Sequence, residues 1–369
     1  MKVPFIDLAA QYKSLKPEID QALNAVLSNG NFIGGEAIKT FERNFAGLCG
    51  VTECVGLGNA TDGLFLALKA LGIGVGDEVV TPAWSWISSS EVITLTGATP
   101  VFADVDPVLF TITAAGIQNK ITSKTKAVIV VHLYGHMAEV ESIKNLCDQK
   151  NLFLIEDCSQ AHMAEDNKVK AGATGNCGVF SFYPTKNLGA YGDAGCLVTS
   201  NHELATKVRR LANHGGLHKD EHLYEGTNSR LDVLQAVILD VKIKHLSAWT
   251  KKRISNAQFY KHNLNDVKSV LLPNVRRGAV HSFHLFVILV KQRDKLKDFL
   301  EKNDVQTLIH YPMALPFEPA YNYLKHKEED FPVSVSLQKS VLSLPIHPEL
   351  NEDQIIYVCD LIRSFYGGN

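Results

Sequence analysis

Apolar residues recur along the chain with two alternating periods, and this alternation predicts the fold class. Short apolar runs typical of strands are followed by stretches with helical spacing. The predicted strands occupy residues 54–58, 78–81, 100–104, 126–133 and 152–157, and the helices between them occupy residues 64–68, 87–96 and 139–149. The run at 126–133 is almost entirely β-branched, as expected of a strand buried on both faces of a parallel sheet. The pattern therefore predicts βαβ units with right-handed crossovers, which is an α/β domain.

Helical spacing on either side of this region extends the predicted domain, and the pattern changes beyond about residue 250. Helices are expected at residues 17–28, 36–48 and 233–264, the first of them closed by Gly30. The later elements are expected to be strands at 284–290 and 305–309 and helices at 293–302 and 352–365. We therefore predict a large domain over residues 1–250 and a smaller α+β domain over residues 251–369.

Length and composition agree with two domains and exclude several classes of protein. A chain of 369 residues with 46% hydrophobic and 21% charged residues is typical of a globular protein and exceeds what one core usually supports. The formal charge of −2 provides no basic surface for nucleic acid or for a membrane. Residues 1–11 lack the apolar core of a signal peptide, and no apolar run reaches the roughly 18 residues of a membrane-spanning helix.

The cysteines and histidines do not form the patterns of a metal site. Seven scattered cysteines without a C-x-x-C pair argue against a disulfide framework and against structural zinc. Glycine interrupts both His132 to His136 and His214 to His218, so neither pair is expected on one face of a helix. We expect no metal, and a reducing cytoplasm as the location.

The strongest candidate for chemistry is a lysine in a glycine-rich turn. Residues 178–183 are apolar and aromatic, Pro184 ends this run, and Lys186 follows before Gly189 and Gly192. A lysine at the end of a buried strand loses hydration, which disfavours the ammonium form. A neutral amine can attack a carbonyl to form a Schiff base. The alternative is an ordinary exposed lysine in a surface loop.

A carboxylate and an indole are candidate partners for a flat, cationic ring. Asp157 ends a buried strand, where a carboxylate is costly without a cation, and ligands of open α/β sheets bind at this edge. A pyridinium nitrogen would be a suitable partner. Alternatively, Glu156 and Asp157 cap a following helix. Trp86 follows another strand, and it either stacks on such a ring or lies in the core.

The segment at residues 58–63 precedes a helix and lacks the common nucleotide fingerprints. Leu64 stands where a phosphate loop requires lysine, and Thr61 stands where the dinucleotide fingerprint has its third glycine. What remains is a hydroxyl group and free N–H groups at a helix N-terminus, which suit a single phosphate. The alternative is a plain N-cap by Thr61 or Asp62.

Five segments occur in an order that is more specific than any of them alone. They are Gly58-Asn59-Ala60-Thr61-Asp62-Gly63, Trp86, Glu156-Asp157-Cys158-Ser159-Gln160-Ala161-His162, Ser181-Phe182-Tyr183-Pro184-Thr185-Lys186-Asn187-Leu188-Gly189 and Asn228-Ser229-Arg230-Leu231-Asp232. Together they resemble the DegT/DnrJ/EryC1/StrS sugar aminotransferases over nearly the whole chain. The resemblance implies a pyridoxal-phosphate enzyme of fold type I, like aspartate aminotransferase, with a mixed, mostly parallel sheet in the large domain.

The resemblance also implies roles for individual residues. Lys186 would form the internal aldimine with pyridoxal phosphate and shuttle the proton, and Asp157 would keep the pyridine nitrogen protonated. The other residues implied to hold the cofactor are Ala60, Thr61, Asp62, Trp86, Gln160, Ser181 and Asn228. Asn228 would reach the phosphate from the other subunit, which implies an obligate homodimer with a shared active site. Substrate contacts are expected from His162, Tyr183, His310 and Tyr311.

The resemblance implies a ping-pong transamination. L-glutamate would convert the cofactor to pyridoxamine phosphate, 2-oxoglutarate would leave, and a nucleotide-linked keto sugar would take the amine. The sequence at residues 186–190 resembles the branch that aminates C-3 of dTDP-linked 6-deoxy sugars, for surface glycans such as lipopolysaccharide O-antigen or for antibiotic sugars.

The alternatives are C-4 amination or a UDP-linked 3-keto sugar. Met163 and residues 314–317 depart from the usual pattern of the family, so the identity of the sugar stays open. An alternative of another class is a regulatory protein that keeps the fold without catalysis. Such a protein would be expected to lose Lys186 or Asp157, and both are present.

Overall fold

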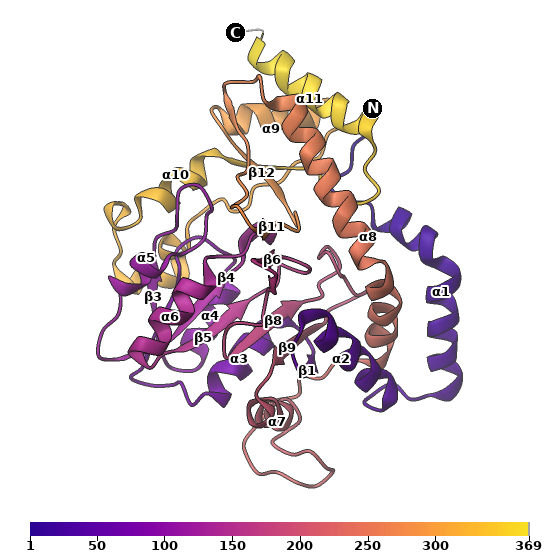
Figure 1. Cartoon of the computed structure of the whole chain (residues 1–369), viewed down its shortest axis with the longest axis vertical. Coiled ribbons are helices and arrows are strands. Elements are labelled where there is room, and N and C mark those ends of the chain that lie inside the picture. Colours follow the sequence, from indigo (N-terminus) through magenta and orange to yellow (C-terminus); the bar gives the residue numbers. More distant parts are fainter. Residues whose placement is uncertain (368–369) are drawn as a thin grey trace.

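The computed structural model describes residues 1–367, and a seven-stranded sheet lies at the centre of the large domain (Figure 1). Its strands are β1 (Glu53–Leu57), β2 (Glu78–Pro82), β3 (Thr99–Ala103), β4 (Thr125–Val131), β5 (Phe153–Asp157), β8 (Cys177–Ser181) and β9 (Gly195–Thr199). They are arranged in the order β1-β9-β8-β5-β4-β2-β3. In this sheet β9 runs opposite to the other six strands, which all point the same way. The predicted α/β class with a mixed, mostly parallel sheet is confirmed.

Helices cover both faces of the sheet, so its strands are buried on both sides. In β4, Val128 and Val130 pack into one hydrophobic core, whereas Ala127 and Ile129 pack into another. This alternation explains the β-branched run in the sequence, since side chains of a strand point to opposite faces in turn. The helices of this domain are α2 (Glu36–Cys49), α3 (Ala60–Ala70), α4 (Ser88–Leu95), α5 (Ala114–Gln118), α6 (Val140–Lys150) and α7 (His202–Leu211).

The smaller domain contains a three-stranded sheet packed against helices. Its elements are β10 (Val270–Leu271), β12 (Phe286–Val290), β13 (Val341–Leu344), α9 (Arg293–Lys302), α10 (Pro332–Ser340) and α11 (Glu352–Gly367). The strand predicted at 305–309 is wrong. Val305 makes an isolated bridge to Val3, and Leu308 makes one to Ser343. The sequence pattern also missed β13, which adjoins β12 in the sheet.

Short elements join these parts. A small sheet contains β6 (Glu165–Asp166), β7 (Val169–Lys170) and β11 (Ala279–Val280). Short 3₁₀ helices lie at Leu133–Gly135, Leu315–Phe317, Pro319–Leu324 and Glu328–Asp330. Among residues 1–367, no helix combines the length and the apolar content that crossing a membrane requires.

Two long helices lie side by side and connect the domains (Figure 1). The first, α1 (Leu8–Asn29), begins earlier than predicted because Asp7 caps it, and Gly30 ends it in the left-handed conformation as expected. The second, α8 (Val233–Leu264), packs Leu246 into the core of the large domain and Ala257 into that of the small domain. We propose to keep the division at residue 250, between these two positions.

Candidate active site

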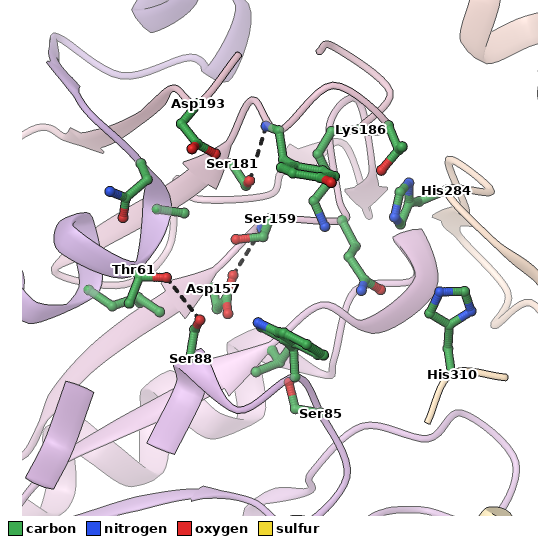
Figure 2. A pocket seen from close by; sticks show the side chains of 18 of the residues that line it. Thr61, Ser85, Ser88, Asp157, Ser159, Ser181, Lys186, Asp193, His284 and His310 are labelled. Carbon is green, nitrogen blue, oxygen red and sulfur yellow. Dashed lines mark hydrogen bonds between the residues drawn. The ribbon is translucent and has the colours of Figure 1, made fainter. Parts of the chain in front are cut away.

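A cavity of about 460 Å³ opens at the carboxyl ends of the parallel strands (Figure 2). Ten of the predicted site residues line it: Ala60, Thr61, Trp86, Asp157, Gln160, Ser181, Tyr183, Lys186, His310 and Tyr311. In Figure 2, the hydroxyl groups of Thr61, Ser88 and Ser181 lie toward one end of the cavity, whereas His284 and His310 lie toward the other. The structure therefore brings together residues that are far apart in the sequence.

Lys186 lies in a tight turn just after β8. The backbone N–H of Lys186 donates to the Tyr183 carbonyl oxygen at 2.8 Å. The turn then folds back so closely that a Cβ at Gly189 would lie 2.3 Å from the Pro184 carbonyl oxygen, and only glycine fits there. Burial lowers the pKa of the Lys186 amine to about 8, although the Asp157 carboxylate acts in the opposite direction. A substantial fraction of this amine is therefore neutral near physiological pH.

Asp157 is the last residue of β5, and its side chain is only 6% exposed. One carboxylate oxygen accepts the Ser159 N–H at 3.0 Å. Within residues 1–367, no lysine, arginine or histidine forms an ion pair with this carboxylate. No helix begins after it, so the alternative of a helix cap is wrong. A nearly buried, unpaired carboxylate that faces a cavity is suited to a cationic group on a ligand.

The neighbouring Glu156 points to the opposite face of the sheet and anchors the strand that carries Asp157. Its carboxylate accepts His132 Nε2–H at 2.8 Å and the N–H groups of Gly172, Thr174 and Gly175 at 2.6–3.0 Å. Burial alone would raise the pKa of Glu156, but these hydrogen bonds outweigh it and lower that pKa. The four donors occupy both oxygens of the Glu156 carboxylate, so we assign Glu156 a structural role.

The N-terminus of α3 forms the end of the cavity that suits a phosphate. Asn59 is the helix cap, because its side chain accepts the Asp62 N–H at 2.8 Å, so the alternative of a cap by Thr61 or Asp62 is wrong. The first N–H groups of a helix have no partner within the helix, which leaves those of Ala60 and Thr61 for a ligand. At Gly195 a Cβ would lie 2.6 Å from the Ala60 nitrogen, so glycine permits this close approach.

Aromatic residues and an amide line the opposite side of the cavity. Trp86 is 60% exposed and is therefore not a core residue, unlike Trp84. The Gln160 amide is fixed at both ends: its oxygen accepts the Tyr134 N–H at 2.7 Å, and its nitrogen donates to the Tyr311 hydroxyl at 2.9 Å. The site therefore has one exposed flat surface and one firmly oriented amide.

Three of the predicted site residues do not line this cavity. The Asp62 carboxylate accepts the Asn59 side-chain amide at 2.9 Å at the start of α3. His162 is buried behind the cavity, with its ring against those of Phe180 and Phe182. Asn228 is exposed and forms an isolated bridge with Asn213, which follows α7 closely in the chain. A loop projects beyond α7 in Figure 1. A role for Asn228 in this chain's own cavity is not supported by this position, so its predicted role depends on a second subunit.

Several lining residues were not predicted from the sequence. They are Asn59, Leu64, Ser85, Ser88, Val131, Ser159, Thr185, Asp193, Ala194 and His284. His284 enters from the small domain, and Asn187 holds its ring through a hydrogen bond of 3.3 Å. Burial and the Lys186 amine lower the pKa of His284 well below its usual value, and they lower that of His310 to about 4. Both imidazoles are therefore neutral.

These residues fit pyridoxal phosphate. A partly neutral lysine suits an aldehyde, an unpaired carboxylate suits a pyridinium nitrogen, and a helix N-terminus with hydroxyl groups suits a phosphate. The indole of Trp86 offers a surface for stacking on a ring. The fold and the site thus define a pyridoxal-phosphate-dependent aminotransferase of fold type I.

Comparison with known proteins supports the assignment to this class of aminotransferase. The model of the DegT/DnrJ/EryC1/StrS aminotransferase family matches residues 13–363. A UDP-N-acetyl-3-dehydro-alpha-D-glucosamine 3-aminotransferase of Acidithiobacillus ferrooxidans is 41% identical over 99% of this chain and 98% of its own. A dTDP-3-amino-3,6-dideoxy-alpha-D-galactopyranose transaminase of Aneurinibacillus thermoaerophilus is 40% identical over 98% and 99%, respectively.

A solved structure shows the same likeness over the whole fold. The crystal structure of S. venezuelae DesV, in complex with a ketimine intermediate, superposes with a TM-score of 0.97. It is 38% identical in sequence and covers 99% of this chain and 98% of its own. The chain belongs to the DegT/DnrJ/EryC1/StrS aminotransferase family, and it is a pyridoxal-phosphate-dependent sugar aminotransferase.

Proposed function

We propose that this enzyme moves an amino group from L-glutamate to C-3 of a dTDP-linked 3-keto-6-deoxyhexose. One observation carries the chemistry: a lysine with a lowered pKa and an unpaired carboxylate face the same cavity at the carboxyl edge of the sheet. A regulatory protein without catalysis would have no need of this costly pair, so we favour the enzyme.

The bound cofactor supplies an electron sink for both half-reactions. Lys186 Nζ, when neutral, would accept the proton from the amine-bearing carbon of L-glutamate and pass it to the cofactor. In the second half-reaction it would move a proton the opposite way, from the cofactor to the carbon of the sugar that receives the amine. The Asp157 carboxylate would stabilise a proton on the ring nitrogen. Gln160, which Tyr134 and Tyr311 hold in place, presents its remaining amide hydrogen to the cavity. The N-terminus of α3, Thr61 and Ser181 would hold the phosphate.

The choice of sugar nucleotide rests on the resemblance at residues 186–190 and on a relative that acts at C-3 of a dTDP-linked sugar. A relative of similar identity acts at C-3 of a UDP-linked sugar. The alternatives are therefore a UDP-linked 3-keto sugar and amination at C-4. Tyr183, His310 and Tyr311 are the residues we propose to contact the substrate.

The test is a set of keto-sugar nucleotides offered to the pyridoxamine form of the enzyme, with product position assigned by NMR. We expect the dTDP-linked 3-keto-6-deoxyhexose to react with the highest kcat/KM. A higher kcat/KM for the UDP-linked 3-keto sugar, or for a 4-keto sugar, would replace the proposed substrate and leave the aminotransferase chemistry intact.

We further propose an obligate homodimer with shared active sites. Among residues 1–367, Lys186 is the one cationic side chain at the cavity, because both lining imidazoles are neutral. One cationic side chain is too few to bind both a phosphate and the two carboxylates of L-glutamate. The loop that carries Asn228 also exposes Leu223 and Tyr224, as a contact surface would.

Co-expression of two impaired variants tests the shared site. If Asn228 acts in the partner's site, a mixed dimer of Lys186→Ala and Asn228→Ala chains contains one intact site. Random pairing of a two-fold dimer then restores about a quarter of the wild-type sites. Activity no higher than the sum of the two separate variants would contradict the shared site.

We place the enzyme in the cytoplasm, where it would serve synthesis of a surface glycan such as O-antigen or of an antibiotic sugar. All seven cysteines are buried and unpaired, which suits a reducing compartment. Cell fractionation tests this location. Enzyme activity found in an oxidising compartment, with none in the cytoplasmic fraction, would contradict it.

A further inference from the structure

One side of α8 carries polar residues that have no part in the proposed chemistry. Gln235, Lys242 and Arg253 are spaced by seven and eleven residues, which is close to two and three helical turns, so they project from the same side. Lys242 is 0% exposed and Arg253 is 3% exposed. Within residues 1–367 neither cation forms an ion pair. A buried cation without a carboxylate partner is costly, which suggests a specific role for each.

Lys242 contacts the turn that contains Lys186. Its Nζ donates to the Gly189 carbonyl oxygen at 2.7 Å and lies 4.1 Å from the centroid of the Tyr191 ring. Gly189 is three residues beyond Lys186, in the same turn. Burial lowers the pKa of Lys242 to about 8, although the Glu349 carboxylate acts in the opposite direction. A neutral residue of the same length would remove both contacts.

Gln235 holds the next part of the same turn. Its side-chain oxygen accepts the Tyr191 N–H at 2.8 Å, and its side-chain nitrogen donates to the Tyr191 carbonyl at 3.4 Å. Gly192 lies against it, since a Cβ there would be 3.1 Å from the Gln235 nitrogen. The turn that contains Lys186 is rich in glycine, so its backbone can adopt many conformations. The contacts with α8 restrict that freedom.

Arg253 holds the other segment beside Lys186. Its Nη1 donates to the carbonyl oxygens of Phe283 at 3.2 Å and Ile346 at 2.7 Å. Asn187 then ties this segment to the lysine turn, because its side-chain nitrogen donates to the Ser282 carbonyl at 3.1 Å. One side of α8 thus restrains both chain segments that surround the reactive amine.

We propose that Lys242 is a positioning residue for Lys186: by holding the Gly189 carbonyl and the Tyr191 ring, it keeps the Lys186 amine inside the cavity and close to Asp157. The inference rests on the proposed function, in which Lys186 is the reactive amine. Without Lys242 the turn loosens and the Lys186 side chain gains access to water. Its amine is then less desolvated and less well aimed at the reacting carbon.

The test compares Lys242→Met with wild type and with Lys261→Met. Lys261 lies on the same helix, is partly buried and has its ammonium 5.8 Å from the Phe283 ring, but makes no hydrogen bond to the lysine turn. Each protein is loaded with pyridoxamine phosphate, which leaves Lys186 as a free amine. The rate at which an acylating reagent labels Lys186 is then followed against pH by peptide mass spectrometry.

We expect Lys242→Met to raise the pH midpoint of Lys186 labelling above that of wild type. It should also lower kcat about tenfold or more, with the KM for L-glutamate little changed, since a displaced catalytic group impairs the chemical step. Lys261→Met should match wild type in both respects. Lys242→Arg, which keeps the charge and the donors, should recover most of kcat.

A purely structural role predicts something different: a lower melting temperature, but the wild-type midpoint and the wild-type kcat per folded molecule. That result would overturn the inference. If Lys242→Met does not fold, Gln235→Met removes the hydrogen bonds to Tyr191 without touching a buried charge, and the same upward shift is expected. A wild-type enzyme that forms no bond between Lys186 and pyridoxal phosphate would instead contradict the proposed function itself.

Discussion

The lowered pKa of Lys186 has a measurable consequence in the enzyme freed of its cofactor. With a pKa of about 8, roughly a tenth of the amine is neutral at pH 7. An unperturbed lysine, with a pKa of about 10.4, would be neutral to only roughly 0.04% at that pH. Burial of Lys186 therefore raises the reactive fraction on the order of 200-fold at pH 7.

The assay is site-resolved acylation of the cofactor-free enzyme between pH 6 and pH 10, with an exposed lysine such as Lys13 as internal reference. We expect the labelling rate of Lys186 to reach half of its plateau near pH 8, about two pH units below the ordinary value for a lysine side chain. Asp157→Asn removes a negative charge that favours the ammonium, so it should move the Lys186 midpoint further down. A Lys186 midpoint near the ordinary value for a lysine side chain would refute the reasoning, and an upward shift in Asp157→Asn would refute the assigned electrostatics.

Three further substitutions test other parts of the site. Lys186→Ala should abolish turnover and remove the visible absorbance of the lysine-bound cofactor while the enzyme stays folded, which circular dichroism checks. Gly195→Ala places a Cβ 2.6 Å from the Ala60 nitrogen and should weaken pyridoxal-phosphate binding about tenfold or more, measured by fluorescence titration. The control is Gly47→Ala. Gly47 lies in helix α2, a Cβ there would have no atom within 4 Å, and the affinity for pyridoxal phosphate should stay unchanged. Asn228→Ala should speed loss of the cofactor on dialysis, whereas retention equal to wild type would count against a role at the partner's phosphate site.

Local sequence patterns were sufficient for most strands and helices of the large domain and for the two central residues of the site, but they did not predict β9, α5 or α7. Asp157 ends a strand and Lys186 follows one, the burial of both strands is visible in the sequence, and the edge of a parallel sheet brings such positions together. The helix cap at Asn59 was assigned to its neighbours, because Asn59, Thr61 and Asp62 can all cap a helix and only the backbone decides between them.

The remaining parts of the site depend on contacts between distant segments. His284 reaches the cavity from the small domain, and its place depends on Asn187 and Arg253, which no local pattern connects. Residues 305–309 have the composition of a strand, yet they form only isolated bridges. β13 follows α10 directly, without the turn residues that announce a strand.

The most direct test of the account is an absorbance spectrum of the purified enzyme with pyridoxal phosphate, before and after L-glutamate is added. We expect a visible band that L-glutamate removes as the pyridoxamine form appears, and that a keto-sugar nucleotide restores. The Lys186→Ala protein should lack this band. A wild-type enzyme that gives no such band, or a band that persists with L-glutamate, would contradict the central claim that Lys186 carries the cofactor for amino transfer.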